Sequence, residues 1–435
     1  MVPPAPCGHA NKTPHGGMVP TPSRGRHDRA PSGRRGRGRR TIGAWEAPPM
    51  TKPERSITLE KFVADTGDRD RSAVFAGRGA ELDWLRKQVA TMRAMWEDFG
   101  RAQGSIRTVT GCPGIGKTAL LRRFADECGD DPLIVEPTLD DLLSVDALSE
   151  RARAQVAPAL KDVSAAVLGS FKLDAAGRFL GELAERHGIR RSGILLLLDE
   201  AQQVTEDRHG SVIHFLHTGS QGQPIFPVFF GLDDTHDSLE RAGASRVPPE
   251  NRLRLEVMDH ADSEAVLRKF ERTFDVHTPC ELAEHLLADS QGFPQHLNSA
   301  LRSLGEEWLR AGGRGGGLDA AAVSEKARAR REAYYEGRLS GSFGRNTRIA
   351  AAAADLAGRS DVAQEALIEM LVSKFVDTLG WAPGPATDQA AEDFFRTIVR
   401  RGLLAPDAEG LYRTPIPSFL SWIRDKYIDR DLQSQ

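Results

Sequence analysis

The segment that most constrains this chain is 111–118, which reads Gly-Cys-Pro-Gly-Ile-Gly-Lys-Thr. It matches the phosphate-binding loop pattern, with a β-prone run before it at 106–110 and a helix-prone run after it at 119–125. Glycines let backbone N–H groups turn towards phosphate oxygens, and the helix N-terminus adds the positive end of its dipole. This strand–loop–helix order predicts a nucleotide phosphate site rather than an ordinary glycine-rich turn.

Two side chains of this loop have predicted roles in ATP chemistry. We expect Lys117 to reach the β- and γ-phosphates of ATP, and Thr118 to hold Mg²⁺ through its hydroxyl. ATP and Mg²⁺ are therefore the expected cofactors. The predicted nucleotide-binding residues of the loop are Gly111, Cys112, Pro113, Gly114, Ile115, Gly116, Lys117, Thr118 and Ala119.

A second motif supports the first. Residues 194–200 read Ile-Leu-Leu-Leu-Leu-Asp-Glu, an apolar run typical of a central parallel strand, ending where open α/β sheets bind ligands. Asp199 fits the Walker B carboxylate that orders Mg²⁺ or its water shell, and Glu200 fits the general base that polarises the attacking water. A solvated acidic turn is the alternative. Paired with the phosphate loop, the two carboxylates predict hydrolysis as well as binding.

Composition limits the class of protein. With 435 residues and 40% apolar content, the chain is long enough for two or three domains with a real core. No apolar run approaches the roughly 18–20 residues that cross a bilayer, and the clear run 194–198 has five. The cysteines at 7, 112, 128 and 280 show no metal-ligand or disulfide spacing, which suits a reducing cytoplasm. We interpret Cys112 as a small residue within the loop.

The N-terminal segment 1–55 differs from the rest. It carries eleven Lys and Arg against three Asp and Glu, is rich in Pro, Gly and Arg, and cannot bury enough apolar surface to fold alone. One interpretation is a disordered tether for nucleic acid. A solvated tail and an upstream extension from a misplaced start codon are simpler, and Met50 is a plausible start.

The rest of the chain divides into four predicted regions. Residues 56–257 alternate strands and helices from 105 onward, which predicts an α/β P-loop core with a parallel sheet. The expected strands are 106–110, 132–136, 193–199, 226–231 and 251–256, and the expected core helices are 117–128, 140–157, 175–188, 208–217 and 236–242. The remaining regions are a helical lid at 258–312, a glycine-rich joint and charged helix at 313–344, and a compact domain at 345–435.

The last domain has the order of a winged helix. Helical stretches at 346–357, 362–376 and 388–401 precede a β-hairpin, and such domains often place a helix in the DNA major groove. Nearby arginines favour DNA contact. The acidic residues of the domain argue against it, and many winged helices only dock proteins. The arginines are Arg396, Arg400 and Arg401. The charges of the helix before this domain are most simply a solvated face.

With these motifs in place, the chain resembles AAA+ P-loop ATPases, most closely the origin-recognition-like group with its plasmid, mobile-element and signal-transduction relatives. The resemblance covers 72–312, with a weaker extension through the winged helix. The segment 75–78, Phe-Ala-Gly-Arg, followed by Glu81-Leu82, matches the part that borders the adenine in these proteins, which adds Arg78 to the nucleotide-binding residues.

The resemblance also implies residues that sense phosphate. Strand 226–232 takes the sensor 1 place, and the polar residues after it are candidates or a simple acidic turn: Asp233, Asp234 and Thr235. Arg246 lies where such ATPases present an arginine finger to a neighbouring subunit, with Arg252 and Arg254 as competitors. A surface arginine without that role is an equal alternative, and the role implies a homo-oligomer.

The segment 291–297, Gln-Gly-Phe-Pro-Gln-His-Leu, fits the turn that opens the sensor 2 helix of the lid. Here the sequence departs from the AAA+ pattern, because the expected arginine is missing from the first turn. His296 and Arg302 are the candidates, and a packed lid histidine is the default for His296. This departure moves the lid towards signal-transduction ATPases with a Gly-x-Pro lid.

Two classes of function follow. The preferred one is an ATP-hydrolysing AAA+ switch or motor that acts on DNA or on a DNA-bound protein. The alternative is a regulator in which nucleotide occupancy alone switches the winged helix, with little turnover. Glu200 argues for the first, because a pure switch has less need of a general base. A kinase is a weak third reading, because the sequence has neither an arginine-rich lid nor an acceptor-site signature.

Overall fold

The computed structural model describes residues 58–64, 74–99, 106–129, 131–218, 222–245, 247–313, 317–407 and 409–428. Three sequence predictions lie outside these residues: the basic tail 1–55, the start at Met50 and the arginine finger Arg246.

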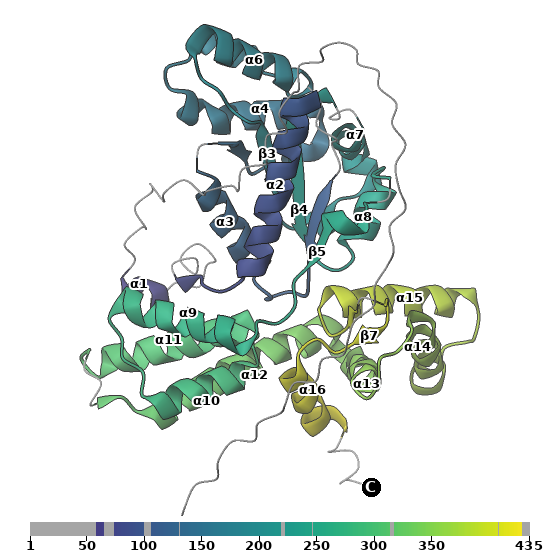
Figure 1. Cartoon of the computed structure of the whole chain (residues 1–435). Coiled ribbons are helices and arrows are strands. Elements are labelled where there is room, and N and C mark those ends of the chain that lie inside the picture. The colour runs from purple at the N-terminus through teal and green to yellow at the C-terminus, as the bar shows by residue number, and fades with distance from the viewer. Residues whose placement is uncertain are drawn as a thin grey trace, which may run out of the picture. The chain divides into compact units, whose positions relative to one another are not determined.

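A five-stranded parallel sheet forms the centre of the α/β part (Figure 1). Its strand order is β2-β3-β4-β1-β5, so β4 lies between the strand of the phosphate loop and the strand of the acidic pair. All five strands fall at the predicted places, which confirms the α/β fold class. The strands are β1 (Arg107–Thr110), β2 (Leu133–Val135), β3 (Ile194–Leu198), β4 (Ile225–Gly231) and β5 (Arg252–Arg254).

Helices cover both faces of this sheet. Strand β3 is buried throughout, and its alternate residues belong to two cores: Leu195 and Leu197 pack in the cluster of α2 and α3, whereas Leu196 packs in the cluster of α4, α6, α7 and α8. This explains the uninterrupted apolar run. The helices are α2 (Gly79–Phe99), α3 (Lys117–Cys128), α4 (Val145–Val156), α5 (Ala165–Gly169), α6 (Ala176–His187), α7 (Glu206–His217) and α8 (Thr235–Arg241).

Several short turns of helix complete the description. They are η2 (Asp140–Leu143), η3 (Ala157–Leu160), η4 (Leu173–Ala175), η5 (Ala201–Gln203), η7 (Pro249–Asn251) and η9 (Gly344–Asn346), with a π-helical turn, η10 (Arg424–Ile428).

Among the described residues, no helix is both long enough and apolar enough to cross a membrane.

Three helices form the lid, within the predicted region 258–312. They are α9 (His260–Phe274), α10 (Cys280–Ser290) and α11 (Pro294–Arg310). The short helix α1 (Leu59–Ala64) packs with them, because Phe62 lies 5.5 Å from Phe270 between ring centroids and shares their apolar cluster. The first part of the predicted core region 56–257 therefore packs with the lid. The domain limits themselves remain a prediction.

The turn at Gly292, between α10 and α11, is hydrogen-bonded to the segment that follows the last strand of the sheet. Met258 lies just beyond β5, and its N–H donates to the carbonyl oxygen of Gly292 at 2.9 Å. Gly292 has φ +70°, and a Cβ atom at this position would lie 2.0 Å from the Met258 oxygen. Only glycine allows this approach, because any side chain would collide with backbone.

We expect Gly292→Ala to destabilise the protein by about 3 kcal/mol or more, because the clash adds to the cost of a left-handed backbone. Gly188→Ala is the matched control: Gly188 has φ +67° but no neighbour within 4 Å, so about 1 kcal/mol is expected there. Thermal unfolding of the full chain measures both. Equal shifts in the two variants would show that the Met258 contact is dispensable.

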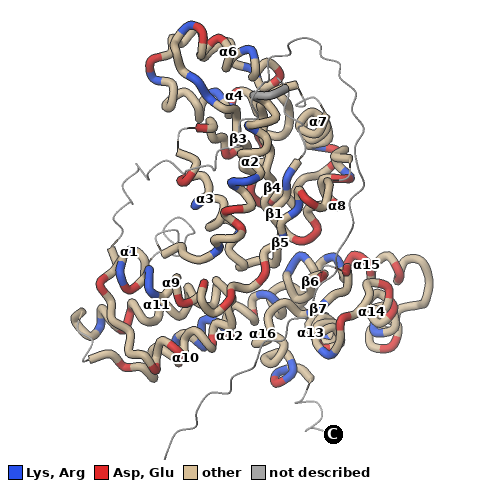
Figure 2. The backbone as a smooth tube through the Cα atoms, in the orientation of Figure 1, with Lys and Arg blue, Asp and Glu red and all other residues tan. Residues whose placement is uncertain are grey.

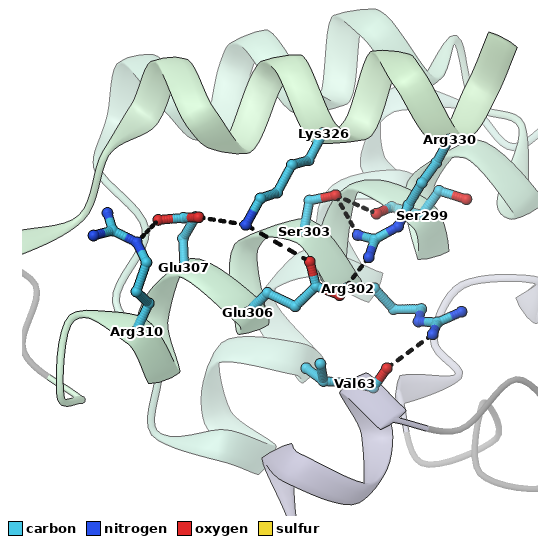
Figure 3. Close-up of polar contacts among 9 residues, drawn as sticks. All are labelled: Val63, Ser299, Arg302, Ser303, Glu306, Glu307, Arg310, Lys326 and Arg330. Carbon is cyan, nitrogen blue, oxygen red and sulfur yellow. Dashed lines mark hydrogen bonds and ion pairs between the residues drawn. The ribbon is translucent and has the colours of Figure 1, made fainter. Parts of the chain in front are cut away.

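The charged helix α12 (Ala320–Phe343) lies within the predicted region 313–344, but it is not simply solvated along its lid side. Lys326 donates to Glu307 of α11 at 2.6 Å, and Arg330 donates to Ser303 at 2.6 Å and pairs with Glu306 (Figure 3). Glu307 also accepts from Arg310 at 2.5 Å. The acidic partners belong to another helix, so the charge pattern of α12 alone could not reveal them.

The C-terminal region has the predicted order of three helices and a hairpin. Val362, between the first two helices, makes a β-bridge to Tyr412 of the hairpin, which is consistent with a winged helix. A last helix, absent from the sequence prediction, stacks Phe419 on Tyr335 at 4.7 Å. The elements are α13 (Thr347–Ala357), α14 (Gln364–Leu379), α15 (Pro385–Arg400), β6 (Ala405–Pro406), β7 (Tyr412–Arg413) and α16 (Pro417–Ile423).

Candidate nucleotide site

The phosphate loop has the backbone that its glycines predict. Gly111, Gly114 and Gly116 have φ of +153°, +84° and +100°, and the loop leads from β1 directly into α3. A Cβ at Gly114 would lie 2.7 Å from the Tyr334 hydroxyl and 3.1 Å from Phe293. The loop therefore has no room for a side chain at Gly114, and its left-handed glycines fit a backbone whose N–H groups approach phosphate closely.

Lys117, at the first turn of α3, is buried and bends back over the loop. Its ammonium donates to the carbonyl oxygens of Gly111 at 2.8 Å and Cys112 at 3.1 Å. Burial lowers the pKa of Lys117. Burial also raises the pKa of the Cys112 thiol to about 11, so this buried side chain is neutral at physiological pH.

Thr118 and Asp199 lie together as a magnesium site requires. The Thr118 hydroxyl donates to Asp199 Oδ2 at 2.6 Å, which joins the loop to the end of β3 across β4. Burial raises the pKa of Asp199, and the hydrogen bond from Thr118 opposes that shift. Within the described parts of the chain, no three His, Cys, Asp or Glu side chains gather as a metal site. A hydroxyl and a carboxylate with phosphate oxygens suit Mg²⁺.

Glu200 has a left-handed backbone, with φ 58° and ψ 33°, directly after β3. Its carboxylate accepts from Gln202 Nε2 at 2.6 Å, while the Gln202 oxygen accepts from the Leu232 N–H at 3.1 Å. One amide thus links the candidate base to the end of β4. Gln202 is a site residue that the sequence analysis missed, although its place after the Asp-Glu pair was a usable signal.

A cavity of about 1090 Å³ is lined by Lys117, Thr118, Glu200 and Gln202, whereas Asp199 lies behind Thr118 and does not line it. Its wall combines apolar residues from the segment before α2 and from the lid with charged residues from the loop and beyond. That mixture suits a purine base and a polyphosphate. The apolar group includes Val74, Phe75, Met258, Val266 and Leu297, and the charged or polar group includes Lys117, Thr118, Glu200, Arg241, Arg338, Arg400 and Arg401.

Arg78 lines the wall of this cavity, and its role in nucleotide binding stays a prediction. It is buried, donates to Glu81 at 2.7 Å and to the carbonyl oxygen of Ile115 at 3.1 Å, and its N–H donates to Asp262 of α9 at 3.2 Å. Arg78 therefore connects the phosphate loop to the lid. Its side chain supports the loop backbone instead of pointing freely at a ligand.

The sensor 1 candidates have other partners. Asp233 accepts from Arg254 at 3.0 Å, Asp234 accepts from Arg400 at 2.7 Å, and Thr235 is buried at the start of α8. None of the three lines the cavity, whereas Leu232 does. Their sensor role stays a prediction.

The sensor 2 candidates also lie off the cavity wall. His296 packs against the rings of Phe293, Tyr334 and Tyr335, and burial lowers its pKa to about 3, so it is the packed lid histidine of the default interpretation. Arg302 donates to the carbonyl oxygen of Val63 at 2.8 Å, next to α1 (Figure 3).

Comparisons with known proteins agree with this geometry. Residues 100–239 match the AAA domain family. A solved Walker-type ATPase of Pyrococcus abyssi is similar, with 16% identity and a TM-score of 0.55 over 83% of this chain and 99% of that one. The core has the AAA+ fold. The predicted resemblance is thereby confirmed. The five-stranded sheet and its covering helices, residues 79–254, are called the AAA+ core below.

Further solved structures are more distant. The Aeropyrum pernix ORC2 protein, in complexes with ADPNP and ADP, has 14% identity and a TM-score of 0.47 over 86% of this chain and 98% of its own. The Aeropyrum pernix ORC1 protein in complex with DNA has 15% identity and a TM-score of 0.39 over 84% and 98%. No curated protein matches the chain.

The C-terminal arginines predicted for DNA do not form one free basic face. Arg396 pairs with Glu392 and Asp393 of its own helix, Arg400 pairs with Asp234 of the AAA+ core, and Arg401 lines the cavity. Figure 2 shows basic and acidic residues interspersed along the described chain. Two of the three arginines therefore face the nucleotide site.

Proposed function

We propose that this protein is an ATP-hydrolysing AAA+ switch. The observation that carries the proposal is the Thr118–Asp199 hydrogen bond, which brings the two motifs into one site beside Glu200. Lys117 would neutralise charge on the β- and γ-phosphates, and Thr118 and Asp199 would hold Mg²⁺, which would offset further phosphate charge. Glu200 accepts a proton from the attacking water.

A nucleotide-gated regulator with little turnover is the second candidate. It is favoured by the Gln202 contact, because Glu200 then shares its carboxylate with an amide instead of being fully available to water. In that case ATP would act only through its different affinities for two conformations. The two candidates differ in one measurable quantity, the rate of phosphate release.

DNA action is the finer part of the proposal. Arg400 is held by Asp234, and Arg401 is at the cavity, so DNA contact through α15 requires the C-terminal domain to separate from the AAA+ core. Nucleotide state would then control DNA access. ATP hydrolysis measured with and without duplex DNA tests this coupling: stimulation supports it, and indifference leaves a protein partner.

Arg246 is proposed as the arginine finger that a neighbouring subunit supplies. We expect the specific ATPase rate of the wild-type chain to rise with protein concentration, and that rise to vanish in Arg246→Ala, because the finger acts in trans. Arg208→Ala is the control, since Arg208 is an exposed arginine of α7 paired with Asp140 at 3.5 Å. A concentration-independent rate in the wild type would contradict the oligomer.

A further inference from the structure

The lid supplies no positively charged side chain to the wall of the nucleotide site. The start of α11 contributes Pro294, Gln295, Leu297 and Asn298 to the cavity wall, none of them cationic. His296 packs among aromatic rings, and Arg302 donates to the carbonyl oxygen of Val63 in α1. If a cation beyond Lys117 contacts the terminal phosphates, it must come from another element.

Arg338 of α12 is in the right place. Its Nη2 donates to the carbonyl oxygen of Pro113 at 2.7 Å, its guanidinium lies 4.5 Å from the centre of the Tyr334 ring, and it lines the cavity. The Tyr334 hydroxyl donates to the same oxygen at 3.1 Å. Lys117 is bonded to the two carbonyls that precede Pro113, so the phosphates that Lys117 reaches lie beside this guanidinium.

The charge balance points the same way. Arg241, Arg338 and Arg401 line the cavity, and within the described residues no carboxylate lies within ion-pair distance of any of them. Arg338 uses its donors on two neutral carbonyl oxygens, of Pro113 and Arg401, and a guanidinium has five. An arginine with spare donors at a phosphate loop suits a phosphate oxygen.

We propose that Arg338 binds the terminal phosphate of the nucleotide in place of the lid arginine that this chain lacks. The inference rests on the proposed function. Arg338 also donates to the carbonyl oxygen of Arg401, at 2.8 Å, directly after α15. A phosphate that draws the guanidinium towards itself competes for that bond, so occupancy by ATP weakens the contact between α12 and the end of α15.

The test compares nucleotide affinities of Arg338→Gln and Arg331→Gln in the full chain. Arg331 is a matched control on the same helix: it donates to the carbonyl oxygen of Asp289 in the lid at 2.7 Å, pairs with the Asp289 carboxylate at 3.3 Å and does not line the cavity. Calorimetric titration with the non-hydrolysable analogue AMP-PNP and with ADP gives both dissociation constants for each protein.

We expect Arg338→Gln to weaken AMP-PNP binding about tenfold or more and ADP binding clearly less, which lowers the preference for the triphosphate. Arg331→Gln keeps the wild-type preference, and Arg338→Lys restores part of it. An unchanged preference in Arg338→Gln overturns the inference and leaves the ATPase proposal standing. Absence of nucleotide binding in the wild type overturns both.

Discussion

Glu200→Gln is expected to lower the turnover of ATP by about 10²–10⁴-fold, the usual contribution of a positioned general base. The amide keeps the size of the side chain but cannot accept a proton from water. Binding of ATP should survive, since the phosphate loop, Thr118 and Asp199 are untouched. Phosphate release at saturating ATP, together with the dissociation constant for AMP-PNP, separates the two effects.

The control for this experiment is Glu185→Gln, the same chemical change on α6 at a carboxylate that does not line the cavity. Its rate should equal that of the wild type. A wild-type rate in Glu200→Gln would remove Glu200 as the base. A wild-type chain that binds ATP without turnover would favour the nucleotide-gated regulator.

Lys117→Met should weaken ATP binding by about a hundredfold or more, because charge-assisted hydrogen bonds to two phosphates are lost while the aliphatic stem is kept. The nucleotide-free protein should be no less stable than the wild type. Burial lowers the pKa of Lys117, which means that the fold bears a cost for the charged form. Calorimetric titration and thermal unfolding without nucleotide give the two readouts.

Lys172→Met is the matched control, since Lys172 is exposed and lies outside the cavity wall. Its affinity for ATP should be that of the wild type. If Lys117→Met lowered the thermal midpoint sharply without nucleotide, the lysine would be a structural residue of the loop, and the loss of binding would follow from misfolding. If binding were unchanged, the phosphate site would be elsewhere.

The sequence anticipated those parts of the site that depend on local order. The loop 111–118, helix α3 and strand β3 lie within a residue of their predicted bounds, because glycine spacing and an unbroken apolar run act over a few neighbouring residues. The meeting of Thr118 with Asp199 was also predictable, since the carboxyl ends of parallel strands share one edge.

Predictions about charged residues were weaker, for one physical reason. A charge is stabilised by whichever opposite charge or polar group the fold brings near it, and that partner can lie anywhere in the chain. Arg400 pairs with Asp234, 166 residues away. Lys326 and Arg330 pair with α11, so the solvated face expected for α12 was wrong on its lid side.

By itself, the sequence determined the P-loop core, the order of its strands along the chain, the acidic pair and the absence of an arginine at the start of α11. Only the tertiary structure placed Tyr334 and Arg338 against Pro113, more than 220 residues away. A motif can be recognised in the sequence because the local backbone conformation restricts which residue types can occupy neighbouring positions. Contacts between distant helices depend on packing, which leaves no such local pattern.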